Sequence, residues 1–199
     1  MADNKLQAIG LAGTNGSGKD TVGRILAEKY GYLFVSVTDL LRAEAIRRGL
    51  PVEREVLRTI SAEWRRESGL GVLVDKAITE YEAAKGNYVG VVIASLRNPG
   101  EADRIHEIGG SMVWLDADPR VRYNRIQANT ATRGRAKEDS KTFEQFNSEE
   151  AAEMNKPTNG DAANLNMSAV KARCDIFITN DEEKKELSLQ LKQALANLI

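Results

Sequence analysis

Residues 10–26 read GLAGTNGSGKDTVGRIL, and they carry the most specific pattern in the sequence. Gly13, Gly18 and Lys19 fit the pattern G-x-x-x-x-G-K. The apolar run at 8–12 just before it is typical of a buried strand, and apolar residues after it recur at helical spacing. Between a strand and a helix, such glycines let the backbone wrap around phosphate oxygens, which the amides and the helix N-terminus attract. The stretch therefore predicts a phosphate-binding loop whose lysine reaches the β and γ phosphates.

One position in this loop departs from the usual pattern. Ser or Thr normally follows the lysine, but here Asp20 follows it and Thr21 comes next. Thr21 still suits contact with an α phosphate. Asp20 either meets Mg²⁺, directly or through water, because this ion prefers hard oxygen ligands, or is a solvent-facing residue favoured by the helix dipole. The expected nucleotide-binding residues of this stretch are Gly13, Thr14, Asn15, Gly16, Ser17, Gly18, Lys19, Asp20 and Thr21.

Short apolar runs alternate along the chain with longer helical patterns. The candidate strands are residues 8–12, 32–36, 88–95, 111–116 and 174–179. Four of these runs are nearly continuously apolar, as strands buried on both faces are. The alternation predicts an α/β fold with a five-stranded parallel sheet covered by helices on both faces.

Two stretches are longer than a simple strand–helix alternation requires. Residues 39–85 hold about three helical patterns, and residues 128–164 are polar and include the basic run TRGRAK. Long excursions of this kind in α/β folds commonly carry substrate contacts and lids. We therefore expect a single domain over 1–199, with an acceptor-binding insertion at 39–85 and a lid at 128–164. The core would comprise residues 1–38, 86–127 and 165–199.

Composition excludes several classes of protein. Of the 199 residues, 42% are hydrophobic and 29% are charged, with a net charge of −1, so nothing favours binding to nucleic acid or to an anionic membrane. One cysteine, Cys174, allows no internal disulfide, and one histidine, His106, gives no cluster for a transition metal. With no apolar run of signal-peptide or membrane-spanning length, we expect a cytoplasmic protein. Cys174 is expected in the core and His106 on the surface.

Several arginines outside the loop are expected to be exposed. Arg65 and Arg66 beside Trp64 are predicted to lie on an exposed helix face, because one aromatic residue among acidic neighbours is poor support for a nucleic-acid patch. Arg120 and Arg122 are expected on the surface of their helix.

The loop also carries a resemblance to a known family. Residues 13–21, GTNGSGKDT, resemble the G-x-x-G-x-G-K-x-T loop of adenylate kinases and their nucleoside monophosphate kinase relatives. Four further segments are similar to this family: VSVTDLLRAEA (35–45), VVIASLRNPGEADRI (91–105), DADPRVRYNRI (116–126) and FITND (177–181). Within it, GKDT with RNPGEADRIHEIGG resembles phage-type deoxynucleoside monophosphate kinases. RGRAKEDSKTFEQF, followed by an acidic helix and CDIFITND, resembles archaeal proteins related to dephospho-CoA kinase.

The resemblance implies roles for individual residues. Asp39 would order the waters of Mg²⁺, and Arg42 and Arg97 would hold the acceptor phosphate. Arg125 would lie against the ATP base, near the base-contacting loop that contains Asn180. In the polar insertion, Arg133 and Arg135 are either lid arginines that neutralise the transferring phosphoryl group or part of a solvated basic loop. The expected catalytic residues are thus Lys19, Arg97, Arg125, Arg133 and Arg135, and the expected magnesium-binding residues are Asp20, Thr21 and Asp39.

The chain departs from the family at two places. Ala94 and Ser95 stand where the third strand of these kinases often ends in a magnesium-organising aspartate, and Val37 stands where adenylate kinases read the acceptor base with threonine. We expect a kinase that moves the γ-phosphoryl group of ATP, with Mg²⁺, to a small phosphorylated acceptor, in the first place a (deoxy)nucleoside monophosphate. Two alternatives remain open: a dephospho-CoA kinase-like activity, and a nucleotide-binding regulator with weak ATP hydrolysis.

Overall fold

The computed structural model describes residues 6–84, 86–129, 141–154, 160–181 and 184–196. Its central element is a parallel five-stranded sheet with the strand order β2-β3-β1-β4-β5. The strands are β1 (Gln7–Gly13), β2 (Leu33–Ser36), β3 (Gly90–Ala94), β4 (Ser111–Asp116) and β5 (Ile176–Thr179). All five predicted strands are therefore confirmed, each within two residues of the expected bounds.

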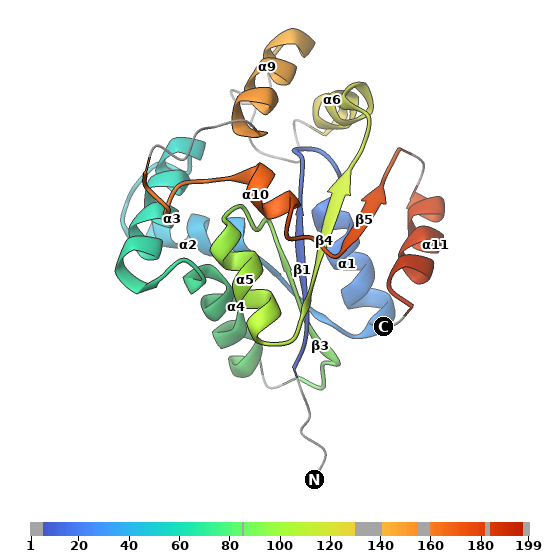
Figure 1. Ribbon diagram of the computed structural model, residues 1–199, viewed down its shortest axis with the longest axis horizontal. Helices are drawn as coiled ribbons and strands as arrows, with labels where there is room; N and C mark the ends of the chain where they lie inside the picture. The colour runs from blue at the N-terminus through green and yellow to red at the C-terminus, as the bar shows by residue number, and fades with distance from the viewer. Residues whose placement is uncertain (1–5, 85, 130–140, 155–159, 182–183, 197–199) are drawn as a thin grey trace.

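Helices cover both faces of this sheet (Figure 1). The helices before β3 are α1 (Lys19–Tyr30), α2 (Val37–Arg47), α3 (Arg54–Ser68) and α4 (Val72–Ala83). The later helices are α5 (Pro99–Glu107), α6 (Pro119–Ala128), α9 (Phe143–Met154), α10 (Met167–Lys171) and α11 (Lys184–Ala194). The three helical patterns expected between residues 39 and 85 are thus present as α2, α3 and α4. Among the described residues, no helix combines the length and the apolarity that crossing a bilayer would need.

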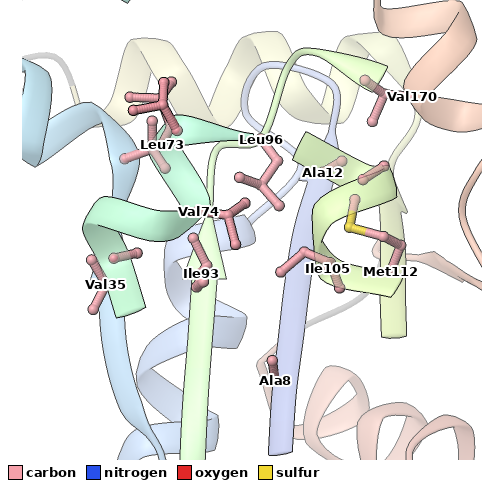
Figure 2. Packing of buried hydrophobic residues seen from close by; sticks show 14 of the residues in the cluster. Ala8, Ala12, Val35, Leu73, Val74, Ile93, Leu96, Ile105, Met112 and Val170 are labelled. Carbon is pink, nitrogen blue, oxygen red and sulfur yellow. The ribbon is translucent and has the colours of Figure 1, made fainter. Parts of the chain in front are cut away.

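Side chains alternate between two hydrophobic clusters, one on each face of the sheet, because successive strand residues point in opposite directions. On one face, residues of β1, β3 and β4 pack under α4, α5 and α10, as Figure 2 shows for Ala12, Ile93, Met112, Leu73, Val74, Ile105 and Val170. On the other face, the alternate strand residues pack against α1 and α11, through Val22, Leu26, Leu187, Leu191 and Leu195. Cys174 lies in the first cluster, which confirms the expected core position.

The carboxyl ends of the parallel strands all face the same edge of the sheet, where ligands bind in open α/β folds. The loop after β1 lies at this edge, and α6 and α9 lie beyond it in Figure 1. The fold thus places residues from β1, β3, β4, α6 and α9 around one region.

Two predictions about exposed arginines are wrong. Arg65 of α3 is buried, because it forms an ion pair with Glu101 of α5, which is also buried. Arg122 of α6 is buried as well, next to the loop after β1. Arg66, Arg120 and His106 are exposed, as expected.

Candidate functional site

The loop after β1 has a backbone that requires glycine at both ends. Gly13 has φ 141°, and a Cβ there would lie 1.9 Å from the carbonyl oxygen of Leu115. Gly18 has φ 97°, and its Cβ would lie 2.5 Å from Nδ2 of Asn180. L-residues with side chains rarely adopt these values of φ. The glycines of the sequence pattern are therefore needed where the loop after β1 passes Leu115 of β4 and Asn180.

Lys19 is folded into this loop and is almost fully buried. Its Nζ donates to the carbonyl oxygen of Thr14 at 2.6 Å and to that of Gly13 at 3.0 Å. Burial, together with the positive charges of Arg97 and Arg122, lowers the pKa of Lys19 to about 7. The predicted phosphate-binding lysine thus lies among backbone carbonyl groups, and the charges of two nearby arginines affect its pKa.

Because of this environment, we expect nucleotide binding to be coupled to the uptake of a proton by Lys19. At about pH 8, above the folded-state pKa of about 7, most Lys19 side chains are neutral in the absence of ligand. A phosphate anion beside Nζ favours the ammonium form and raises the pKa again. Binding of ATP at about pH 8 should therefore take up close to one proton, and binding at about pH 6 should take up almost none at this site. Calorimetry in two buffers with different ionisation enthalpies measures this uptake. Equal proton uptake at both pH values would contradict the assignment.

The two residues expected near the base lie together on the other side of the loop. Asn180 is buried, and its Nδ2 donates to the carbonyl oxygen of Ser17 at 2.8 Å. Its own carbonyl oxygen accepts a hydrogen bond from Nη1 of Arg125 at 2.6 Å. Asn180 thus joins the end of β5 to the loop, and α6 brings Arg125 to the same place.

Asp116 is a residue of this site that sequence reasoning missed. It ends β4, and its Oδ1 accepts the hydroxyl hydrogen of Thr14 at 2.7 Å. On the other side of β1, Ala94 ends β3 without a carboxylate, and Ser95 follows with φ 72°. A carboxylate at the end of a strand next to β1 was the signal available in the sequence, because parallel strands end at one edge.

Arg122 supports the loop from α6. Its Nη1 donates to the carbonyl oxygen of Asn15 at 3.3 Å, and its Nε donates to that of Ala117 at 2.7 Å. Arg122 also forms an ion pair with Glu150 of α9. The charged sequence of α6 has no clear apolar periodicity, so this inward-facing position left no pattern in the sequence.

The two predicted acceptor arginines have separate carboxylate partners. Arg42 of α2 pairs with Asp39 at 3.0 Å, and the Asp39 side chain is exposed. Arg97 pairs with Glu153 of α9, with 3.2 Å between Nη1 and Oε2. Arg42 and Asp39 therefore contact each other, while Arg97 lies in a different cluster of charges.

That cluster contains two further arginines that no motif in the sequence had indicated. Arg54 and Arg58, one turn apart on α3, both form ion pairs with Glu153. Burial acts to raise the pKa of Glu153, but the positive charges of Arg97, Arg54 and Arg58 outweigh it and lower the pKa below its usual value. We call Arg54, Arg58 and Arg97 the arginine cluster.

A buried network holds the backbone of Arg97. Glu101 accepts hydrogen bonds from the backbone N–H groups of Arg97 at 2.7 Å and Asn98 at 3.0 Å. Asn98 begins α5 and caps it, with Pro99 in the first turn. Arg65 of α3 forms an ion pair with Glu101, with 2.6 Å between Nη2 and Oε1. Arg97 is thus placed by a fixed turn between β3 and α5.

The proposed magnesium ligands stay predictions. Asp20 is exposed in the first turn of α1, next to Thr21. Within the described ranges, no three or more His, Cys, Asp or Glu side chains gather as a metal-binding group. Magnesium that keeps most of its waters and binds phosphate needs only one or two carboxylates from the protein, so the oxygen donors present fit this ion. Arg133 and Arg135 lie outside the described residues.

The chain is similar to several known proteins. A family model described as an AAA domain matches residues 9–154. The UPF0200 protein of Pyrobaculum aerophilum is 30% identical over 198 residues, which cover 97% of this chain and 99% of the relative. A shikimate kinase of Gloeobacter violaceus is 39% identical over 127 residues, 62% of this chain and 63% of that protein.

Among solved structures, shikimate kinase from Bacteroides thetaiotaomicron aligns with a TM-score of 0.58 and 17% identity, covering 96% of this chain and 98% of that chain. At this identity the likeness concerns the fold, and it confirms the expected α/β architecture with a parallel sheet. The narrower resemblance to nucleoside monophosphate kinases stays a prediction.

Proposed function

The chain belongs to the UPF0200 family, and we propose that it is an ATP-dependent small-molecule kinase whose acceptor carries an anionic group. The observation that carries the proposal is the closeness of two kinds of anion-binding residue. Lys19 lies in a phosphate-binding loop, and the charge of Arg97 in the neighbouring arginine cluster lowers its pKa. A donor phosphate at the lysine and an acceptor anion at the arginines would then face each other.

On the donor side, the amides of residues 13–18 and the Lys19 ammonium would hold the β and γ phosphates of ATP. Thr21 would contact the α phosphate, and Asn180 with Arg125 would lie beside the base. Mg²⁺ would be held by the phosphates together with Asp20, Thr21 or Asp39, directly or through water. The ion would neutralise charge that develops on the transferred group. Asp116, hydrogen-bonded to Thr14, adds a carboxylate at the same edge.

On the acceptor side, guanidinium groups bind phosphate or carboxylate oxygens in a two-pronged geometry that lysine does not reproduce. Arg97 would hold the anionic group, and Arg42 would contact another part of the acceptor from α2. Arg133 and Arg135 would neutralise charge on the transferring phosphoryl group. A phosphate acceptor already presents an oxyanion as nucleophile, so no general base is needed.

The acceptor we favour is a (deoxy)nucleoside monophosphate, as the similarity of the segments at 35–45 and 91–105 to nucleoside monophosphate kinases supports. Dephospho-CoA is an alternative. A small hydroxy acid is a further candidate, because the 39% identity over 127 residues is to a protein named shikimate kinase.

A nucleotide-binding regulator with weak ATP hydrolysis is the rival from another class. The absence of a carboxylate at Ala94 and Ser95 favours the regulator. The arginine cluster argues against it, because a protein that only binds and hydrolyses ATP needs no second anion-binding site. Release of ADP from ATP and Mg²⁺ distinguishes the two. We expect one member of a panel of nucleoside monophosphates, dephospho-CoA and shikimate to accelerate ADP release well above the basal rate. A rate that no member of the panel changes would favour the regulator.

A further inference from the structure

Glu153 is held by arginines from two distant parts of the chain. Arg54 and Arg58 reach it from α3, and Arg97 reaches it from the turn after β3. The Glu153 side chain is 17% exposed, and the three arginine side chains are between 25% and 29% exposed. This is a partly buried anion site, built before any ligand arrives, in which a side chain of the protein is the anion.

The Glu153 carboxylate leaves one donor of the arginine cluster, on Arg58, without a partner. Arg54 has a second, longer contact to Glu149 at 3.9 Å, and Arg58 has a second contact to the exposed Glu55 at 2.6 Å. Nε of Arg58 is buried and has no hydrogen-bond partner among the described residues. A buried donor without a partner costs free energy, so a ligand with more oxygen atoms than a carboxylate would bind here more favourably. A phosphate monoester offers three such oxygens and up to two negative charges.

The helix that carries Glu153 also contacts the donor side. Glu150, one turn earlier on α9, pairs with Arg122, which itself donates to the carbonyl oxygen of Asn15 in the phosphate-binding loop. Phe146 of the same helix packs near Tyr123 of α6, with 5.9 Å between ring centroids. Figure 1 places α9 beyond the carboxyl ends of the strands, above the sheet. One short helix thus spans the region between the phosphate-binding loop and the arginine cluster.

We propose that the arginine cluster is the binding site for a phosphate group of the acceptor, and that Glu153 of α9 occupies it as an internal anion that the acceptor must displace. That the bound phosphate belongs to an acceptor rests on the proposed function, whereas the presence of an anion-binding site occupied by Glu153 does not. Because Glu153 and the ligand compete for the same three guanidinium groups, the apparent affinity for phosphate equals the intrinsic affinity multiplied by the fraction of molecules in which Glu153 has left. Loading of the acceptor is then coupled to movement of α9 away from the loop.

The test uses the full chain and inorganic phosphate as the probe, in the absence of nucleotide and at constant ionic strength. Removing the charge of Glu153 with Glu153→Gln should tighten phosphate binding by about tenfold or more, measured by calorimetry. Glu144→Gln is the matched control, since it removes the same charge from the first turn of the same helix, away from the cluster. It should bind phosphate as the parent does.

A second substitution locates the effect. Arg58→Gln in the Glu153→Gln background should abolish the gain, because it removes one guanidinium from the cluster. If the gain persists in the double variant, phosphate is binding elsewhere, for instance at the loop after β1, and the proposal is wrong. It is also wrong if Glu153→Gln and Glu144→Gln bind phosphate equally. Should Glu153→Gln fail to fold, Glu153→Asp, with the shorter carboxylate, should tighten binding to a smaller extent, and no tightening in it would overturn the proposal.

Acetate separates phosphate from carboxylate as the preferred anion. We expect acetate to bind the Glu153→Gln variant much more weakly than phosphate, and equal binding would overturn the choice of a phosphate group. These measurements need neither ATP nor turnover. If Glu153→Gln binds phosphate more tightly but the protein transfers no phosphoryl group, the anion site is supported and the proposed kinase activity is wrong. If the protein is an acceptor-dependent kinase but Glu153→Gln binds phosphate no more tightly, the kinase activity is supported and the proposed role of Glu153 is wrong.

Discussion

Replacing Lys19 by alanine is expected to lower turnover by about two to three orders of magnitude, the scale seen when one preorganised charge contact to a transition state is removed. The ammonium lies within the loop, with Nζ at 2.6 Å from the carbonyl oxygen of Thr14, so it is already positioned beside the place for the β and γ phosphates. Steady-state kinetics with the best acceptor measures the loss in kcat and in kcat/KM.

Lys29→Ala is the matched control for this variant. Lys29 lies in the last turn of the same helix, is exposed, and its Nζ donates to Ser188, far along the helix from the loop. Its removal should leave turnover unchanged. Near-parental activity of Lys19→Ala, with circular dichroism equal to that of the parent, would remove Lys19 from the donor site.

Breaking the buried ion pair between Arg65 and Glu101 should give the largest loss of stability. Both side chains are at most 2% exposed, and Glu101 also accepts the backbone N–H groups of Arg97 and Asn98. Arg65→Ala leaves that carboxylate buried without its counter-ion, so we expect the free energy of unfolding to fall by about 3–5 kcal/mol. Urea unfolding measures the change through the midpoint at constant m-value.

Arg66→Ala is the neighbouring control. Arg66 pairs with Asp161 on the surface, where water and salt screen the interaction, so its loss should change the free energy of unfolding far less than the loss of Arg65. Equal effects of the two substitutions would mean that the ion pair with Glu101 adds nothing that an exposed pair does not.

The sheet and the phosphate-binding loop were predictable because their signals are local. Each strand is a short apolar run, and the loop is a fixed spacing of glycines and lysine between a strand and a helix. The close approach of Gly13 to Leu115 shows why these glycines are required, although the partner could not be named from the sequence.

The arginines were predicted less well, because their partners are far away in the chain. Arg65 is buried by Glu101 on another helix, and Arg122 is buried by the loop and by Glu150. A long side chain with a charged end has no periodicity that separates an inward from an outward position. Arg54, Arg58 and Glu153 form a cluster only because the fold brings α3, the turn after β3 and α9 together.

The destination of the γ-phosphoryl group distinguishes a small-molecule kinase from a regulator that only hydrolyses ATP. ATP labelled in its γ-phosphoryl group is incubated with Mg²⁺, the full chain and each acceptor in turn, and the products are separated and identified. We expect the label to appear on one acceptor in an amount equal to the ADP formed. Lys19→Ala should slow this transfer by about two to three orders of magnitude, whereas Lys29→Ala should leave it unchanged. Label found as inorganic phosphate alone, in the same amount whichever acceptor is present, would contradict the proposed kinase activity.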